Sequence, residues 1–244
     1  MIQGITKGVQ AYFGAFQLIS KLKLWRFFVV PMIISVITAI VIGGLSYAFS
    51  DNIGGYIASF WSWEFGKETF TTISTVFGGL IIVVLGFLLF KHIVLALSAP
   101  FMGPVSKKIE EHIIGKEAQA TESSSFELLI RGIRISLRNL IRELILTLPI
   151  LLIGLIPVIG IFSTILLFLM QAYFAGFGNM DYTLERHFNY TDSVKFVKRN
   201  RGLATGNGVI FMLFLLIPVV GVILVLPLSV TAATEITVKR IQQD

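Results

Sequence analysis

The sequence predicts an all-α integral membrane protein. Of its 244 residues, 55% are hydrophobic and 14% are charged, whereas a soluble domain carries about a quarter charged residues. A soluble protein must keep a wet exterior, so this much apolar surface does not fit into one aqueous core. Several apolar stretches are long enough to cross or enter a bilayer as helices, which makes lipid the solvent that suits them.

The residue types argue against an enzyme, a metal site and a nucleic-acid-binding protein. The chain has no cysteine, which excludes disulfides and thiolate chemistry. Its three histidines, His92, His112 and His187, form no pair at a metal-ligand spacing. We find no nucleophile–base pair or phosphate-binding loop and predict no cofactor. The net charge of +6 comes from basic residues that flank apolar runs, a pattern typical of membrane orientation and lipid contact.

The first predicted element is an amphipathic helix over residues 2–19. Its apolar residues recur at helical spacing, but the segment is too polar to span a bilayer. We expect it to lie in the membrane interface, with its aromatic side chains in lipid. Lys7 precedes an amphipathic stretch and not a short apolar core with a cleavage site, so we expect the N-terminus to be retained.

Two spanning helices are predicted at residues 27–49 and 73–97. The first contains no charge, and about 20 apolar residues suffice to cross the bilayer core. The second opens with an apolar run over 73–90 and reaches Lys91 and His92, which we expect at the interface. The prolines at positions 100 and 104 are expected to break the helix within residues 98–104, before a charged helical segment over 105–114.

A basic amphipathic helix is predicted at residues 126–142. Its four arginines share one helical face because they are spaced by three and four residues. They are Arg131, Arg134, Arg138 and Arg142. Such a stripe favours contact with acidic lipid, and a vestibule that attracts anions is the alternative.

Two helical hairpins are predicted from the apolar runs 144–177 and 209–234. Residues 155–160 of the first run match residues 216–221 of the second at five of six positions, and both copies carry a glycine three residues after a proline. Proline removes a helical hydrogen bond and glycine turns the chain, so each run divides into arms of about a dozen residues, short for a span. A kinked helix that crosses once is the alternative. The candidate pore or hairpin-tip residues are Pro157, Gly160, Pro218, Gly221 and Gln171.

The basic residues predict how these elements are oriented. One Lys or Arg lies between the two spans, whereas four precede them, eight fall in 91–142, five in 178–208 and two after 234. Basic segments stay in the cytoplasm, so we predict cytoplasmic termini. A hairpin that dips in and returns keeps 178–208 inside, whereas a single crossing would place it outside. We therefore predict one membrane domain, 1–244, with two spanning helices and two partly inserted hairpins.

Four groups of residues follow one another along nearly the whole chain. They are Arg26–Pro31, Ala99–Gly103, Ile156–Gly160 with Asn179–Tyr182, and Ile217–Pro218 with Pro227 and Thr231–Thr234. This ordered set resembles the CysZ-type sulfate permeases, whose wider family includes the etoposide-induced membrane proteins. The resemblance implies a homo-oligomeric, multi-pass protein of the bacterial inner membrane that passes sulfate into the cell for cysteine synthesis. It also implies two long helices and two half-inserted hairpins.

The same resemblance implies an anion-binding turn. In that family, sulfate binds at a Gly-Leu-Arg-Arg-like turn before the first span, and this chain has Lys23, Leu24, Trp25 and Arg26 there. Leu24 and Arg26 match the pattern, whereas Lys23 and Trp25 depart from it. Lys23 and Arg26 bring two positive charges to a helix N-terminus, where free backbone N–H groups favour anions. We expect Arg26 to pair with the oxyanion, and a headgroup anchor is its alternative role.

Two functions remain open from the sequence. The first is a permease or channel for sulfate or a related small oxyanion, passive or ion-coupled because no ATP-binding motif is present. The second is a non-transporting membrane protein that organises lipids or partner proteins through its basic amphipathic segments.

Overall fold

The protein is helical throughout the part of the chain that the structure, a computed structural model, describes: residues 2–59, 66–115, 124–154, 156, 159–217 and 220–243. Within α4, α6 and α9 some positions are described by their backbone alone. The described helices are α1 (Ile2–Gln10), α2 (Tyr12–Lys21), α3 (Trp25–Ala58), α4 (Lys67–Ile114), α5 (Ser125–Gly154), α6 (Ile159–Leu184), α7 (Tyr190–Arg199), α8 (Arg201–Leu215) and α9 (Val220–Ile241). The prediction of an all-α protein is confirmed over these residues.

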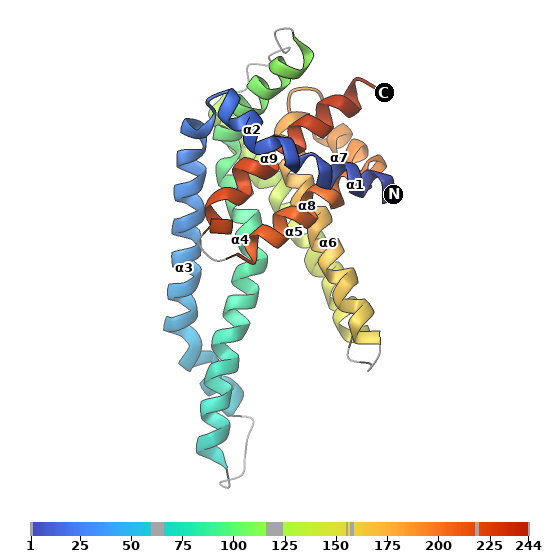
Figure 1. Cartoon of the computed structure of the whole chain (residues 1–244). Coiled ribbons are helices and arrows are strands. Elements are labelled where there is room, and N and C mark those ends of the chain that lie inside the picture. The colour runs from blue at the N-terminus through green and yellow to red at the C-terminus, as the bar shows by residue number, and fades with distance from the viewer. Residues whose placement is uncertain are drawn as a thin grey trace.

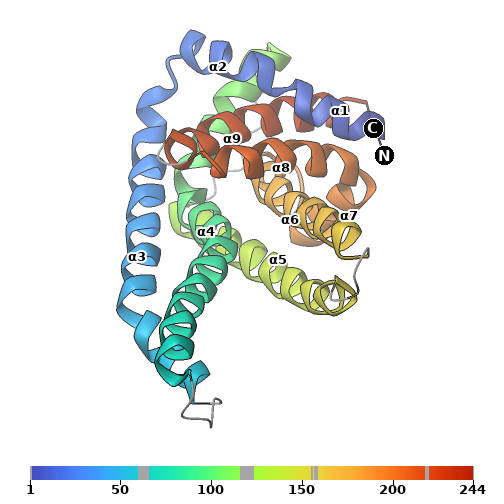
Figure 2. The ribbon, with the colours of Figure 1, turned by 60° about the horizontal axis from the view of Figure 1, so that its bottom comes forward.

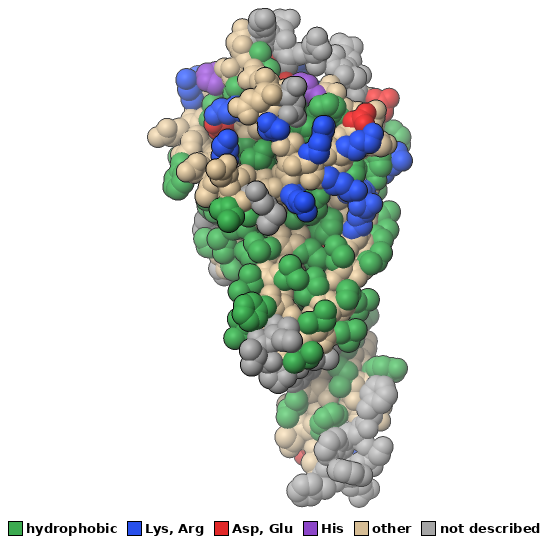
Figure 3. All heavy atoms as spheres, turned by 90° about the vertical axis from the view of Figure 1, so that its right-hand side faces the viewer, with side chains coloured by type: hydrophobic (Ala, Val, Ile, Leu, Met, Phe, Trp, Pro, Cys, Tyr) green, Lys and Arg blue, Asp and Glu red, His purple; other side chains and the backbone are tan. Residues whose placement is uncertain are grey.

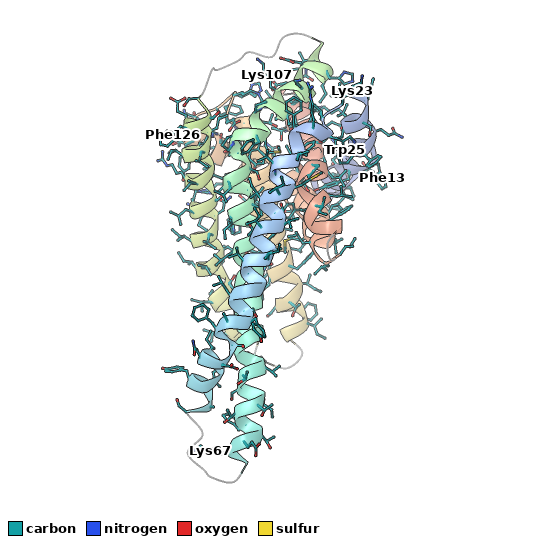
Figure 4. The ribbon with its side chains drawn as sticks, turned by 90° about the vertical axis from the view of Figure 1, so that its left-hand side faces the viewer. Phe13, Lys23, Trp25, Lys67, Lys107 and Phe126 are labelled. Carbon is teal, nitrogen blue, oxygen red and sulfur yellow. The ribbon has the colours of Figure 1, made fainter. Side chains whose placement is uncertain are left out.

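Two helical pairs project from one end of the molecule. The pairs α3–α4 and α5–α6 diverge from an end that holds α1, α2, α7, α8 and α9, and both termini lie at that end (Figure 1, Figure 2). Apolar side chains cover the projecting part, whereas most of the visible Lys and Arg side chains gather toward the other end (Figure 3). Lys23 and Lys107 lie at this end, and Lys67 lies at the far tip of the α3–α4 pair (Figure 4). We call the end with the termini the cationic end.

Three described helical segments are long and apolar enough to cross a membrane. They are Trp25–Ala58, Leu89–Ile114 and Gly160–Leu184. The sequence predicted two spans and assigned the third segment to the hairpin over 144–177. The two helices of this hairpin are longer than the predicted arms. The basic helix continues unbroken into the first arm, so α5 has 30 residues, and α6, the second arm, has 26. The second hairpin keeps one short arm, since the 15 residues of α8 extend about 22 Å. How deeply the hairpins insert stays a prediction.

The predicted break at residues 98–104 is wrong, because α4 continues through Pro100 and Pro104 to Ile114. A proline frees helical carbonyl groups, which need other donors when they are buried. Pro100 and Pro104 free the carbonyls of Ala96 and Pro100, and side chains of α6 and the turn after it bind neighbouring carbonyls of α4 on either side of the prolines. The Tyr182 hydroxyl donates to the Leu95 carbonyl, and the Arg186 Nη1 donates to the Gly103 carbonyl at 3.2 Å. Tertiary contacts thus hold the helix that the local sequence disfavours.

The N-terminal helix predicted over 2–19 is two helices, α1 and α2, with a turn at Ala11. Helix α1 lies against α8, where a Cβ on Gly8 would meet the Leu203 carbonyl at 2.7 Å. The Tyr12 hydroxyl donates to the Asn207 carbonyl at 2.8 Å. Phe13 and Phe16 remain exposed, so the predicted contact of these rings with lipid stays a prediction.

Helices α6 and α8 approach each other so closely that only glycine fits between them. A Cβ on Gly176 would lie 1.8 Å from the Ala204 carbonyl oxygen, and one on Gly208 would lie 1.7 Å from the Ala172 carbonyl oxygen. Small residues permit such backbone contact in membrane helices. This contact attaches the α8–α9 hairpin to α6.

We expect Gly176→Ala to destabilise the protein by about 1–3 kcal/mol, since the added methyl group forces α6 and α8 apart. The measurement is denaturant or thermal unfolding of purified protein in detergent. Gly43→Ala in α3 is the control, because a Cβ there meets nothing within 4 Å and alanine is the better helix former. Equal destabilisation by the two substitutions would contradict this account of the α6–α8 contact.

Candidate functional site

The turn between α2 and α3 brings the four predicted anion-binding residues together at the cationic end. The Leu24 N–H donates to the Ile19 carbonyl at 2.9 Å, and the Lys23 N–H donates to the Ser20 carbonyl at 3.1 Å. This pair of bonds is a Schellman motif that ends α2, and Leu24 and Ile19 are both fully buried beside it. The motif turns the chain, and α3 starts at Trp25.

Lys23 occupies the position of this motif that favours glycine. Its φ is +53°, in the left-handed region, where a side chain costs about 1–2 kcal/mol. Lys23 stands where the Gly-Leu-Arg-Arg-like pattern has glycine. The left-handed backbone conformation of Lys23 explains why glycine suits this position. The Lys23 side chain is exposed, so it adds positive charge to the turn at the expense of backbone strain.

Arg26 and Lys108, a cation from another helix, both lie over the ring of Phe27. The Arg26 Cζ lies 4.9 Å from the centre of the Phe27 ring, and the Lys108 Nζ of α4 lies 4.5 Å from the same centre. Cations over an aromatic face are attracted by its quadrupole. The ring thereby holds two cations near each other. Lys108 is a candidate site residue that the sequence reasoning missed, since it is remote along the chain.

The N-terminus of α3 adds backbone donors to these cations. No side chain caps the helix, and its first turn contains no acidic residue. The Phe27 N–H donates to the Leu24 carbonyl at 2.9 Å, so the backbone donors at this helix start are the N–H groups of Trp25 and Arg26, where the helix dipole favours an anion. Trp25 contributes through its backbone, because its indole N–H donates to the Ser20 hydroxyl at 3.2 Å and its ring packs edge-on against Phe16. We call Lys23, Arg26, Lys108 and this helix start the cationic turn.

The predicted hairpin-tip glycines that the structure describes, Gly160 and Gly221, do not join the cationic turn. Pro157 and Pro218 lie outside the described residues. Gly160 stands in the first turn of α6, at the free end of the α5–α6 hairpin (Figure 1), where a Cβ would meet the Gly154 carbonyl at 2.8 Å. Gly221 stands in the first turn of α9, where a Cβ would meet the Phe214 carbonyl at 1.7 Å. Both glycines therefore permit tight connections between helices.

Lys91 and His92 belong to a buried cluster and do not face the surface, and their position at the level of the membrane interface stays a prediction. The Lys91 Nζ lies 2.7 Å from Glu143 Oε1, and the His92 Nε2 lies 2.9 Å from Glu143 Oε2. Lys91 and Glu143 are 1% and 0% exposed, respectively. Lys91 also donates to the backbone carbonyl of Gln171 at 3.4 Å, which places this predicted pore candidate beside the cluster. The sequence reasoning missed Glu143, which lies between the predicted helix and hairpin.

Glu110 forms a second buried cluster with Arg186 and His187. The Arg186 Nη2 lies 2.7 Å from Glu110 Oε2, and the His187 Nε2 lies 2.6 Å from Glu110 Oε1. Arg186 also donates to the Ser106 hydroxyl at 2.9 Å. This cluster ties α4 to the turn that follows α6. Among the described residues, no group of three or more His, Asp or Glu side chains is arranged to hold a metal ion.

Asp181 forms the third cluster, in the last turn of α6. The Arg131 Nε and Nη2 donate to its two oxygens at 3.1 and 2.9 Å. Burial lowers the pKa of Arg131, but the Asp181 carboxylate more than offsets this, so the pKa is raised. Burial and the same carboxylate raise the pKa of Glu185 to about 8. Glu185 therefore adds little negative charge at neutral pH.

The arginine stripe of α5 thus has more than one role. Arg131 pairs with Asp181, and Arg134 lies over the Tyr190 ring with its Cζ 4.1 Å from the centre. Arg138 lies over the Phe177 ring at 5.0 Å, and Arg142 is exposed. The sequence favoured contact of all four arginines with lipid. In the structure, Arg131 instead points toward α6, where it pairs with Asp181.

Comparison with known proteins gives a family match and a curated relative. The family model described as "Sulfate transporter CysZ/Etoposide-induced protein 2.4" matches residues 11–226 of this chain. A protein from Vibrio parahaemolyticus serotype O3:K6 (strain RIMD 2210633), named sulfate transporter CysZ, is 27% identical over 240 residues. The alignment covers 93% of this chain and 92% of the relative.

We expect Lys23→Gly to stabilise the protein by about 1 kcal/mol, because glycine adopts the left-handed backbone conformation without strain. The measurement is unfolding in detergent. Lys21→Gly is the matched control: it also removes one positive charge, but in the last turn of α2, where glycine costs about 0.5–1 kcal/mol. Equal destabilisation by both substitutions would contradict the role assigned to the Lys23 backbone.

We expect Glu143→Gln to destabilise the protein by about 3–5 kcal/mol, because it leaves the buried Lys91 charge without its partner. The double substitution Lys91→Met with Glu143→Gln should recover much of this loss. Glu111→Gln is the control, since its pair with Lys107 is 3.9 Å long and partly exposed, and such pairs contribute about 0–1 kcal/mol. Thermal unfolding of the three variants beside the wild type checks this, and a cost for Glu143→Gln as small as that of the control would refute it.

Proposed function

Because the chain belongs to the sulfate transporter CysZ/etoposide-induced protein 2.4 family, we propose that it carries sulfate across a bacterial inner membrane. The family match spans most of the chain, and the relative of known name is aligned over almost its full length. The imported sulfate supplies cysteine synthesis. The apolar surface of the α3–α4 and α5–α6 pairs supports a position within the bilayer (Figure 3).

The cationic turn binds the sulfate in this proposal, and its arrangement is the observation on which the site rests. Two side chains, Arg26 and Lys108, carry positive charge beside the Phe27 ring. The uncapped start of α3 adds backbone donors, and Lys23 adds a third charge. A divalent oxyanion offers acceptors to both kinds of group, and charge-assisted hydrogen bonds are stronger than neutral ones.

The cationic end faces the cytoplasm in this proposal, with both termini. Basic segments remain on the cytoplasmic side during insertion, and the cationic end holds Lys23 and Lys107, whereas Lys67 lies at the opposite tip (Figure 4). The cationic turn then holds the anion at the cytoplasmic end of its route, where the positive charge lowers the free energy of the anion. The protein acts as a homo-oligomer, and the hairpins border the route.

We expect Arg26→Ala to weaken sulfate binding about 10- to 100-fold, because a hydrogen bond to a charged group contributes about 1.5–3 kcal/mol. The measurement is uptake of labelled sulfate into proteoliposomes, together with sulfate binding by the same protein in detergent. Arg199→Ala is the control: it removes an exposed arginine from the last turn of α7, away from the cationic turn.

Uptake by the wild type tests the proposed function, and comparison of Arg26→Ala with the wild type tests the proposed site. Wild-type uptake no faster than in protein-free liposomes, with the protein folded, would refute transport of sulfate and favour a protein that organises membrane lipids or partners. Uptake and binding in Arg26→Ala equal to wild type would refute the site and leave the transport function standing.

A further inference from the structure

A large cleft lies between α5 and α6, away from the cationic turn. Its volume is about 840 Å³. Its walls come from α5 and α6, and Ile5 of α1, Lys198 of α7 and Arg201 of α8 close it toward the cationic end. The face in Figure 3 shows Lys and Arg side chains in the upper half and apolar side chains below them.

The lining divides into a charged end and an apolar end because α5 and α6 run in opposite directions. Along α5, Arg138 and Arg142 come before Ile145 and Leu146. Along α6 the order is reversed, so apolar residues such as Leu166 lie beside the apolar turns of α5. The cleft therefore has cations at one end and aliphatic side chains at the other.

Four cations and no acid are among the described residues that line the cleft. The cations are Arg138, Arg142, Lys198 and Arg201. Burial lowers the pKa of Arg138, and the positive charge of the neighbouring Arg142 lowers it further. The start of α8 at Arg201 has no side-chain cap, so its backbone adds positive partial charge. This end of the cleft suits an anion.

The apolar end continues onto a surface that suits hydrocarbon chains. Ile145, Leu146 and Leu166 are 62%, 45% and 53% exposed. Leu148, Leu152 and Ile165 nearby on α5 and α6 are exposed as well. An inorganic oxyanion makes no contacts with such a lining, whereas the acyl chains of a lipid pack against apolar helix surface by van der Waals contact.

We propose that this cleft binds one anionic glycerophospholipid, with its phosphate among Arg138, Arg142 and Arg201 and its acyl chains along the apolar turns of α5 and α6. Basic pockets between membrane helices suit such headgroups. A zwitterionic lipid presents an ammonium group to the same cations and binds more weakly. The site is separate from the cationic turn, so the proposal does not depend on transport of sulfate. A bound lipid joins α5 and α6 to α7 and α8.

The test is titration of the purified full chain in detergent with phosphatidylglycerol or phosphatidylcholine of identical acyl chains, read by native mass spectrometry. We expect saturable binding of phosphatidylglycerol about tenfold tighter than that of phosphatidylcholine. Arg142→Ala with Arg201→Ala, both exposed in the structure, should lower the affinity for phosphatidylglycerol about tenfold or more. Lys195→Ala with Arg199→Ala is the control, which removes two charges from α7 outside the cleft and should change the affinity less than twofold.

A second variant examines the apolar end. Leu166→Glu places a carboxylate at an exposed position and should weaken binding of phosphatidylglycerol without altering the unfolding temperature of the lipid-free protein. The proposal is overturned if both lipids bind equally, or if the control loses as much affinity as the cleft variant. It is also overturned if millimolar sulfate displaces the lipid, which would make the cleft an anion vestibule, or if the cleft variants change the oligomer size, which would make it a subunit contact.

Discussion

Three buried carboxylates of the helical core are paired with cations, and these pairs link the three central helices. Glu143 of α5 contacts Lys91 and His92 of α4. Glu110 of α4 contacts Arg186 beyond α6, and Asp181 of α6 contacts Arg131 of α5. The three pairs close a triangle of α4, α5 and α6. An unpaired charge in this environment costs several kcal/mol, so each carboxylate fixes the position of the helix that supplies its partner.

The triangle explains the shape of the molecule. It joins the α3–α4 and α5–α6 pairs toward the cationic end, and the pairs diverge away from it (Figure 1, Figure 2). The glycine contacts of α6 with α8 and of α1 with α8 then hold the remaining helices against this junction. Close backbone contact of this kind depends on the missing side chain and not on hydrophobic burial, which provides little attraction between helices in lipid.

Basic side chains that take no part in these three ion pairs lie at the surface in two different surroundings. Around the α2–α3 turn, Arg26 and Lys108 flank an aromatic ring at a helix start, which suits a small oxyanion. Around the α5–α6 cleft, Arg142 and Arg201 stand at the end of an aliphatic lining, which suits the phosphate of a lipid. The same residue types therefore favour different ligands because their apolar neighbours differ.

The sequence by itself determined the all-α class, the apolar segments, the uneven distribution of basic residues and the turn that carries Arg26. These features depend on composition, on helical periodicity and on a local motif, all of which are contained in short stretches of chain. Only the tertiary structure decided that α4 continues past Pro100 and Pro104, that Lys91 meets Glu143 and that Lys108 joins Arg26. Each of these depends on a partner from another helix, and periodicity within one segment carries no information about which segments come into contact.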